Sequence, residues 1–113
     1  PAEDHYSILY NITLQNVIAS PNPLVDHTTF WLEHNQACNQ VEIFIDIYDL
    51  AGRHVAALNK ELTPAGFKIG PIEWNGRGTG GENLSGGMYI YRVLLRPDEG
   101  KTAYGSGKLN IIR

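Results

Sequence analysis

The segment Val41–Tyr48 reads VEIFIDIY and alternates between two kinds of side chain. Aliphatic residues occupy the odd positions, which are Val41, Ile43, Ile45 and Ile47. Charged or aromatic residues occupy the even positions, which are Glu42, Phe44, Asp46 and Tyr48. Successive side chains of a β-strand point to opposite faces of the sheet, so this pattern predicts a strand whose aliphatic face is buried in a core.

A turn and a second strand are expected directly after this segment. The turn, residues 49–53, contains Gly52, which can adopt a positive φ at little cost, and Asp49, whose oxygen can accept backbone N–H groups. His54–Leu62 then returns as a strand and forms a hairpin with the first. We therefore interpret Asp49 as a turn residue rather than as half of a catalytic carboxylate pair with Asp46.

Similar short runs toward both ends of the chain predict five further strands. They are Ser7–Ala19, Thr28–Glu33, Phe67–Trp74, Met88–Arg96 and Lys101–Ile112, the last interrupted at Gly105-Ser106-Gly107. Ser20-Pro21-Asn22-Pro23 ends the first of these runs. Within Phe67–Trp74, a parity change at Gly70-Pro71 indicates a bulge or a kink at a strand edge. The segments expected to be turns or loops are 34–39, 63–66, 75–87 and 97–100.

About seven short antiparallel strands with turn signals between them predict an all-β fold, an immunoglobulin-like β-sandwich. A small β-barrel is the alternative. The chain of 113 residues is long enough for one domain with a two-layer core. We expect residues 17–113 to form this domain, and residues 1–16 to be a lead-in segment that is either a linker or a first strand.

The composition argues against nucleic-acid binding and membrane insertion. Nine basic and twelve acidic residues give a net charge of −3, and no basic stripe suited to a phosphate backbone is formed. The single cysteine, Cys38, excludes an internal disulfide framework and is expected to be a small buried residue. No apolar run approaches the roughly 18 residues of a membrane span. The start at Pro1, without a signal peptide, indicates part of a longer protein.

No pattern predicts a catalytic, cofactor or metal site, so we predict that this domain is not an enzyme, although the parent protein could be a protease. The glycine-rich segment 76–81 lacks the Lys-Ser/Thr pair and the helix of a phosphate-binding loop. Four histidines lack metal-ligand spacing and are expected at the surface or in turns. They are His5, His27, His34 and His54.

Six aromatic side chains are candidates for a carbohydrate-binding platform. They are Trp31, Tyr48, Trp74, Tyr89, Tyr91 and Tyr104. Tryptophan and tyrosine are also the usual large core residues of a small sandwich, so we expect most of the six in the core or at its rim.

A series of short motifs runs through most of the chain in a fixed order. It comprises Ser20-Pro21-Asn22-Pro23 followed by Thr28-Thr29-Phe30, then Ile47–Arg53, Leu62–Gly66, Trp74-Asn75-Gly76-Arg77, Leu84–Arg92 and Lys108–Arg113. Over about residues 17–113 the series resembles the C-terminal sorting domain of the type IX (Por) secretion system of Bacteroidetes. It also resembles the related immunoglobulin-like domain of flagellar hook-capping proteins. Each motif alone is weak, whereas their order and spacing together are fairly specific.

The resemblance implies a function in protein secretion. Such domains stand at the C-terminus of exported proteins, and the outer-membrane translocation machinery and its shuttle protein recognise them. In many cargo proteins a sortase then removes the domain. The resemblance places the recognition signal at Lys108, Leu109, Asn110, Ile111, Ile112 and Arg113. Its structural motif positions are Pro21, Asn22, Pro23, Asp49, Gly52, Trp74, Gly76, Gly86 and Tyr89.

A terminal strand also has physical properties suited to a signal. Its edge exposes unpaired backbone donors and acceptors, so a partner could read it by strand addition or by shape. Lys108 and Arg113 add positive charge to an otherwise acidic domain. An ordinary edge strand with solvated charges is the alternative interpretation of the same residues.

The resemblance implies transit through the periplasm to the outer membrane or cell surface, without insertion of this domain into the membrane. The implied partners are shuttle and translocon proteins. A dimer formed through exposed edge strands is also compatible with the sequence. The secretion system's own surface sortase ends in a retained domain of this kind, so such a sortase is one candidate for the parent protein.

The alternative function is a structural or carbohydrate-adhesive spacer module beside a catalytic domain.

Three positions depart from the usual motifs of that family. Asn75 stands where the family has the aspartate of Trp-Asp-Gly, and it keeps an oxygen acceptor but loses the charge. Leu84-Ser85-Gly86-Gly87 replaces the usual Pro-Ser-Gly, and Leu24 replaces a common phenylalanine. We expect none of these differences to break the fold.

Overall fold

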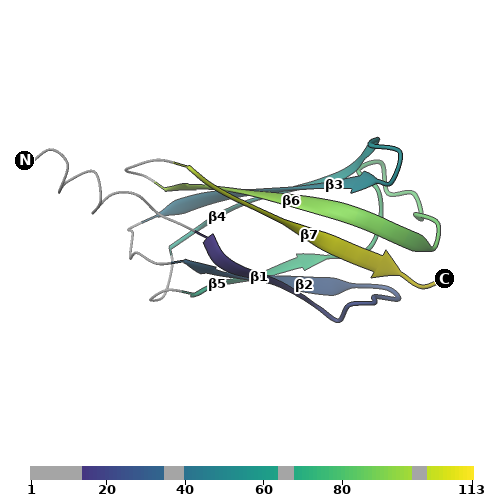
Figure 1. Cartoon of the computed structure of the whole chain (residues 1–113), viewed down its shortest axis with the longest axis horizontal. Helices are drawn as coiled ribbons and strands as arrows, with labels where there is room; N and C mark the ends of the chain where they lie inside the picture. Colours follow the sequence, from purple (N-terminus) through teal and green to yellow (C-terminus); the bar gives the residue numbers. More distant parts are fainter. Residues whose placement is uncertain (1–13, 35–39, 64–67, 98–101) are drawn as a thin grey trace, which may run out of the picture.

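The computed structural model describes residues 14–34, 40–63, 68–97 and 102–113 (Figure 1). Seven β-strands lie within these residues: β1 Leu14–Ser20, β2 Thr28–His34, β3 Val41–Asp49, β4 His54–Leu62, β5 Lys68–Trp74, β6 Gly87–Pro97 and β7 Ala103–Ile111. They form a three-stranded sheet in the order β1-β2-β5 and a four-stranded sheet in the order β4-β3-β6-β7. All pairings between these strands are antiparallel, and the two sheets pack face to face. The predicted all-β sandwich is confirmed.

β3 lies in the interior of the four-stranded sheet, between β4 and β6. Its four odd-numbered aliphatic residues, from Val41 to Ile47, are at most 1% exposed, so the predicted core face is confirmed. β4 pairs with β3 from Leu62 to His54, and the predicted hairpin is therefore present. Gly52 in the connecting turn has a φ of +86°, a conformation that glycine adopts more readily than other residues.

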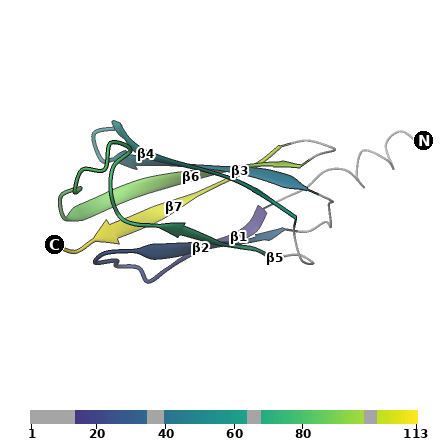
Figure 2. The ribbon, with the colours of Figure 1, turned by 180° about the vertical axis from the view of Figure 1, so that it is seen from behind.

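The position of β4 distinguishes this sandwich from a constant-type immunoglobulin domain. There the fourth strand belongs to the sheet of the first, second and fifth strands. Here the short turn 50–53 returns β4 directly alongside β3, so the four-stranded sheet gains the fourth strand instead. Figure 2 shows β4 and β5 in different layers of the sandwich.

The core fills the space between the two sheets. The rings of Phe30 on β2 and Tyr91 on β6 meet edge to face, with centroids 5.2 Å apart. Trp74 and Tyr89 are also buried, whereas Trp31 and Tyr48 are half-buried and Tyr104 is 67% exposed. The prediction that most of these aromatic side chains lie in the core or at its rim is consistent with this distribution.

Two expectations, one about His34 and one about the continuity of the last strand, are wrong. His34 is not a surface or turn residue, because it continues the inward-facing positions of β2 and is 1% exposed. β7 is not interrupted at Gly105–Gly107, because its register with β6 is continuous from Ala103 to Ile111. Gly107 packs directly against Tyr91, and a Cβ at this position would lie 2.2 Å from the tyrosine hydroxyl oxygen. The glycine therefore permits close packing within the strand.

Of the two alternatives predicted at Gly70-Pro71, the bulge is the one present in β5. The register between β2 and β5 shifts between Phe30 and Leu32, opposite Gly70-Pro71. The shift brings Ile69 and Ile72 to the same buried face. Gly70 packs under Trp31, where a Cβ would lie 2.8 Å from the indole ring.

Several sequence predictions concern residues outside the described ranges, namely His5, Ser7–Thr13, Cys38, Phe67, Lys101 and most of the predicted turns 34–39, 63–66 and 97–100. Within the described ranges, no helix has the length and apolar character needed to cross a membrane.

Candidate recognition site at the end of β7

The residues expected to carry the recognition signal divide between the core and the surface. Leu109 and Ile111 face inward and are at most 2% exposed. Lys108, Ile112 and Arg113 are exposed, and Asn110 is half-buried. The alternation of a β-strand explains this division, so the segment combines core residues with outward-facing side chains.

The outer edge of this segment is already paired. The Asn22 side chain donates to the Lys108 carbonyl oxygen at 3.0 Å and accepts from the Asn110 N–H at 3.1 Å. Leu24 donates its N–H to the Asn110 carbonyl oxygen at 2.9 Å and accepts from the Ile112 N–H at 2.8 Å. The expectation of an unpaired terminal edge is therefore wrong for Lys108–Ile112, because the loop after β1 occupies these backbone groups.

The loop that covers this edge is itself anchored in the sandwich. Leu24 forms an isolated parallel bridge with Ile111, and its side chain is 0% exposed. At the other end of the loop, the Thr28 hydroxyl donates to the Pro21 carbonyl oxygen at 2.8 Å. Pro21 and Pro23 have no N–H to donate, so Asn22 and Leu24 supply the contacts to β7.

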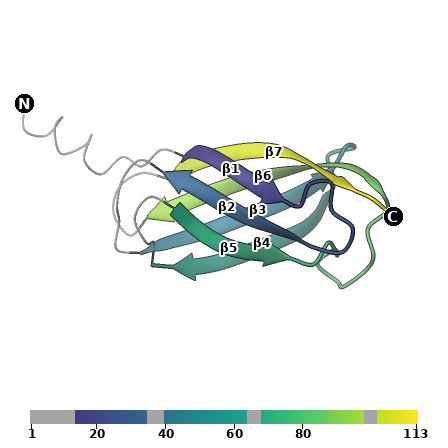
Figure 3. The ribbon, with the colours of Figure 1, turned by 90° about the horizontal axis from the view of Figure 1, so that it is seen from below.

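Arg113 joins three segments of the chain through its guanidinium group. Nε donates to the Leu84 carbonyl oxygen at 2.9 Å, and Nη1 donates to the Val25 carbonyl oxygen at 2.6 Å. Nη2 donates to the Gly76 carbonyl oxygen at 2.9 Å. The planar guanidinium has five N–H donors in fixed directions, so one side chain can bind all three carbonyl groups. Figure 3 shows the C-terminus beside the loops that supply them.

Glycines allow these segments to approach closely. Gly76 has a φ of +72°, and a Cβ at this position would lie 3.1 Å from Leu24 Cδ1. A Cβ at Gly86 would lie 3.3 Å from the Ile111 carbonyl oxygen and 3.3 Å from the Arg113 nitrogen. Both motif glycines therefore lie beside the end of β7.

The loop 75–86 has its own hydrogen bonds. The Trp74 indole N–H donates to the Arg77 carbonyl oxygen at 3.0 Å, and Asn75 Oδ1 accepts from the Arg77 N–H at 3.0 Å. Asn75 thus provides the oxygen acceptor expected at this position. Arg77 also forms an isolated antiparallel bridge with Asn83.

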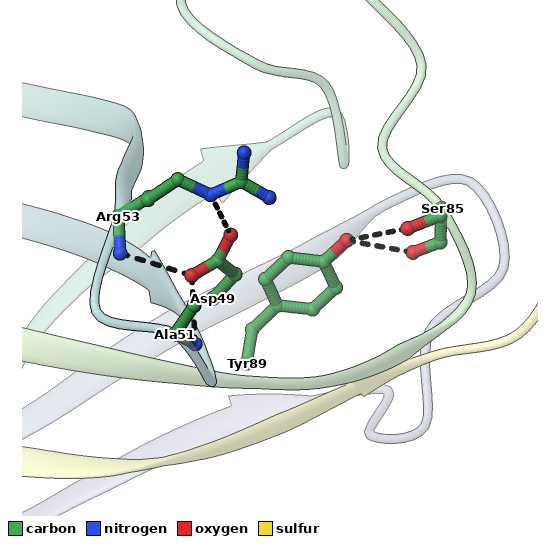
Figure 4. A network of polar contacts seen from close by, with 5 residues as sticks. All are labelled: Asp49, Ala51, Arg53, Ser85 and Tyr89. Carbon is green, nitrogen blue, oxygen red and sulfur yellow. Dashed lines mark hydrogen bonds and ion pairs between the residues drawn. The ribbon is translucent and has the colours of Figure 1, made fainter.

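Two further motif residues, Asp49 and Tyr89, have local structural contacts (Figure 4). Asp49 Oδ1 accepts from the Ala51 and Arg53 N–H groups at 2.9 Å, and Oδ2 accepts from Arg53 Nε at 2.8 Å. The hydrogen bond from the Arg53 backbone lowers the pKa of Asp49 below its ordinary value. The Tyr89 hydroxyl donates to the Ser85 carbonyl oxygen at 2.7 Å. These contacts stabilise a turn and the start of β6.

An exposed apolar pair accompanies the covered strand end. Val25 is 60% exposed and Ile112 is 50% exposed. They follow Leu24 and Ile111, which pair in a parallel bridge, so both point away from the core on neighbouring segments. We call residues 21–25 together with residues 108–113 the C-terminal corner. Its outward side chains include an apolar pair and Lys108.

Among the described residues, no group of three or more His, Cys, Asp or Glu side chains could hold a metal ion.

The chain matches no protein-family model and no curated protein. Its structure is similar to that of dimeric latent PorU from Porphyromonas gingivalis, with a TM-score of 0.73 and 27% sequence identity over 85% of this chain. The match covers 9% of the PorU chain, so this chain corresponds to a small part of that protein.

Two enzymes share the fold. A β-glucuronidase from Parabacteroides merdae has a TM-score of 0.61 at 7% identity, over 89% of this chain and 13% of the enzyme. The alkylpurine DNA glycosylase AlkC from Pseudomonas fluorescens has a TM-score of 0.51 at 10% identity, over 91% of this chain and 31% of the enzyme. The sandwich therefore matches a fraction of two much longer enzymes, and these low identities concern the fold alone.

Proposed function

We propose that this domain is a C-terminal sorting domain, recognised by the outer-membrane translocation machinery of the type IX secretion system and its shuttle protein. Two observations support the proposal. The motif series resembles such domains over about residues 17–113, and PorU, whose name carries the designation of the same Por system, is 27% identical over 85% of the chain. The parent protein is then exported through the periplasm to the outer membrane or cell surface.

The observation that carries the mechanism is the pairing of Lys108–Arg113 with the rest of the fold. Asn22 and Leu24 occupy the outer backbone groups, and Arg113 binds three loop carbonyl oxygens. A partner that added a strand here would have to displace these contacts. We therefore propose that the translocation machinery recognises the folded C-terminal corner through its outward side chains.

A reporter fusion tests this proposal. The 113-residue chain is placed at the C-terminus of a passive periplasmic reporter in a type IX-competent cell, and surface and periplasmic reporter are quantified. Deletion of Lys108–Arg113 is a poor test, because it also removes Leu109 and Ile111 from the core. The sharper variants are Ile112→Asp and Val25→Asp, which change exposed side chains and leave the core intact.

We expect the wild-type fusion at the surface and both variants largely in the periplasm. Leu50→Asp is the matched control, because Leu50 is 68% exposed in the turn after β3, outside the corner. Circular dichroism and thermal unfolding of each purified domain establish that it is folded. Surface delivery of folded Ile112→Asp and Val25→Asp at the wild-type level would exclude recognition through these side chains. Retention of the wild-type fusion in the periplasm would exclude the sorting function itself.

A further inference from the structure

The outward face of the four-stranded sheet contains a second candidate site, separate from the C-terminal corner. An open hollow of about 400 Å³ lies over β3, β6 and β7. Its lining residues are Asp46, Tyr48, Arg92, Val93, Leu94, Tyr104, Gly105 and Ser106. It contains two of the six aromatic side chains considered for a carbohydrate platform, whereas Trp74, Tyr89 and Tyr91 lie in the core.

The floor of the hollow is a row of polar side chains across three strands. Asp46 on β3 pairs in register with Arg92 on β6, and Arg92 pairs with Ser106 on β7. Asp46 Oδ1 lies 2.9 Å from His54 Nε2, while Oδ2 makes no hydrogen bond or ion pair with a described residue. The Arg92 guanidinium is exposed and makes no hydrogen bond or ion pair with any described residue. Unengaged N–H donors of Arg92 and the second carboxylate oxygen of Asp46 therefore stand at paired positions on β6 and β3.

Aromatic rings stand at the two ends of this row. Tyr48 lies two residues beyond Asp46 on β3, and Tyr104 lies two residues before Ser106 on β7. His54 meets the Tyr48 ring edge to face, with centroids 5.3 Å apart, which limits the orientations of that ring. The Tyr104 ring is 67% exposed. Ideal sheet spacing puts the two tyrosine Cα atoms roughly 16 Å apart, further than one sugar ring can span.

We propose that this hollow binds a neutral oligosaccharide, an activity that goes beyond the proposed sorting function and does not depend on it. A pyranose ring has an apolar C–H face that can stack on a tyrosine, and hydroxyl groups that both donate and accept. One hydroxyl accepts from Arg92, and a neighbouring hydroxyl donates to Asp46. The Asp46 carboxylate beside Arg92 disfavours a phosphate or another anion, because it would repel the ligand charge.

Titration of the ¹⁵N-labelled 113-residue chain with defined sugars tests the proposal. The probes are the trisaccharides of cellulose, starch, β-mannan and chitin, the corresponding monosaccharides and inorganic phosphate. We expect at least one trisaccharide to shift the amide resonances of Arg92, Tyr104 and Ser106 with a Kd below about 10 mM. The matching monosaccharide should bind at least about tenfold more weakly, because it reaches only one tyrosine.

Variants assign the roles within the site. Tyr104→Ala and Arg92→Ala should each weaken binding about tenfold, which corresponds to about 1.4 kcal/mol. Tyr104→Phe keeps the ring and should stay within about threefold of wild type. Leu50→Ala and Lys60→Ala are matched controls, because both residues are exposed outside the hollow and should leave binding unchanged.

Three results would overturn the proposal. The first is the absence of resonance shifts with every trisaccharide of the panel. The second is binding that Tyr104→Ala and Arg92→Ala leave unchanged, since the sugar would then lie elsewhere. The third is a response of the same resonances to inorganic phosphate but not to sugars, which would make the hollow an anion site.

Discussion

β4 and β7 are the two edge strands of the same sheet, but the rest of the fold holds them differently. On β4 most side chains are exposed or half-buried, and only Ala56 is fully buried. β7 buries Ala103, Leu109 and Ile111, and the loop after β1 pairs with its outer edge at Lys108–Ile112.

This difference shows that position at a sheet edge does not determine whether a strand is available to a partner. An edge strand is withdrawn from strand addition when another segment satisfies its outer N–H and C=O groups. β7 meets this condition over its last residues. On β4, within the described part of the chain, the backbone hydrogen bond from outside the sheet is the one from Thr79 N–H to the Val55 carbonyl oxygen, at 3.1 Å. If the domain dimerises through an edge, we expect the dimer to use β4 rather than the end of β7.

The largest expected effect is loss of a buried side chain from β7. Leu109→Ala removes a side chain that is 0% exposed and should lower the free energy of unfolding by about 2–5 kcal/mol. Leu58→Ala on β4 is the matched change, and it should cost clearly less because Leu58 is only half-buried. Urea unfolding measures both. Equal losses would contradict the difference between the two edges.

The next effect concerns close packing beneath β7. Gly107→Ala places a Cβ against the Tyr91 ring and should cost about 1–3 kcal/mol. Ser106→Ala, on the outward face next to it, should change the free energy of unfolding by less than about 0.5 kcal/mol. Combining Gly107→Ala with Tyr91→Phe should restore part of the loss, because the hydroxyl oxygen is the atom that the Cβ would meet most closely. Similar losses for Gly107→Ala and Ser106→Ala would refute this account.

A smaller effect should follow loss of the contacts made by Arg113. Arg113→Ala removes hydrogen bonds to three loop carbonyl oxygens and should cost about 1–2 kcal/mol in thermal unfolding. Arg113→Lys should recover only part of this, because an ammonium group lacks the guanidinium fork. Arg53→Ala is the control near β4, where the side chain is 81% exposed, and its loss should be smaller. An unchanged melting temperature for Arg113→Ala would show that these contacts do not stabilise the corner.

The smallest effect is a pH dependence at the packed side of β7. Burial raises the pKa of Tyr91 above its usual value near 10. In the unfolded chain Tyr91 loses its proton at a lower pH than in the folded protein. The free energy of unfolding should therefore fall as the pH rises from about 10 to the pKa of the folded state, and Tyr91 should cause no loss of stability below about pH 10. Denaturant unfolding between about pH 8 and about pH 11 should show a smaller fall for Tyr91→Phe. An equal fall in the free energy of unfolding for the wild type and Tyr91→Phe would exclude Tyr91 as the source of the pH dependence.

Alternation along the chain was enough to predict the architecture. The core face of β3 follows from a period of two and the hairpin with β4 follows from the turn at residues 49–53, and the structure confirms both. The same rule accounts for the error at His34, because its inward position continues the pattern of β2 whereas its polarity suggested a turn. The glycine at position 107 predicted an interruption of the last strand. Its reason is the packing of Tyr91 on the neighbouring strand, which leaves no space for a Cβ and which no local sequence pattern reveals.

The sequence by itself determined the seven strands, the buried face of β3 and the turn at Asp49, because these depend on local alternation and on the conformations of neighbouring residues. Only the tertiary structure decided how the chain end is held. Asn22 and Lys108 are 86 residues apart, and Arg113 reaches loops whose positions depend on the packing of both sheets. Contacts across such separations leave no periodic trace in the sequence, so the alternation predicts an exposed edge at the end of β7, whereas in the fold this end is paired and anchored.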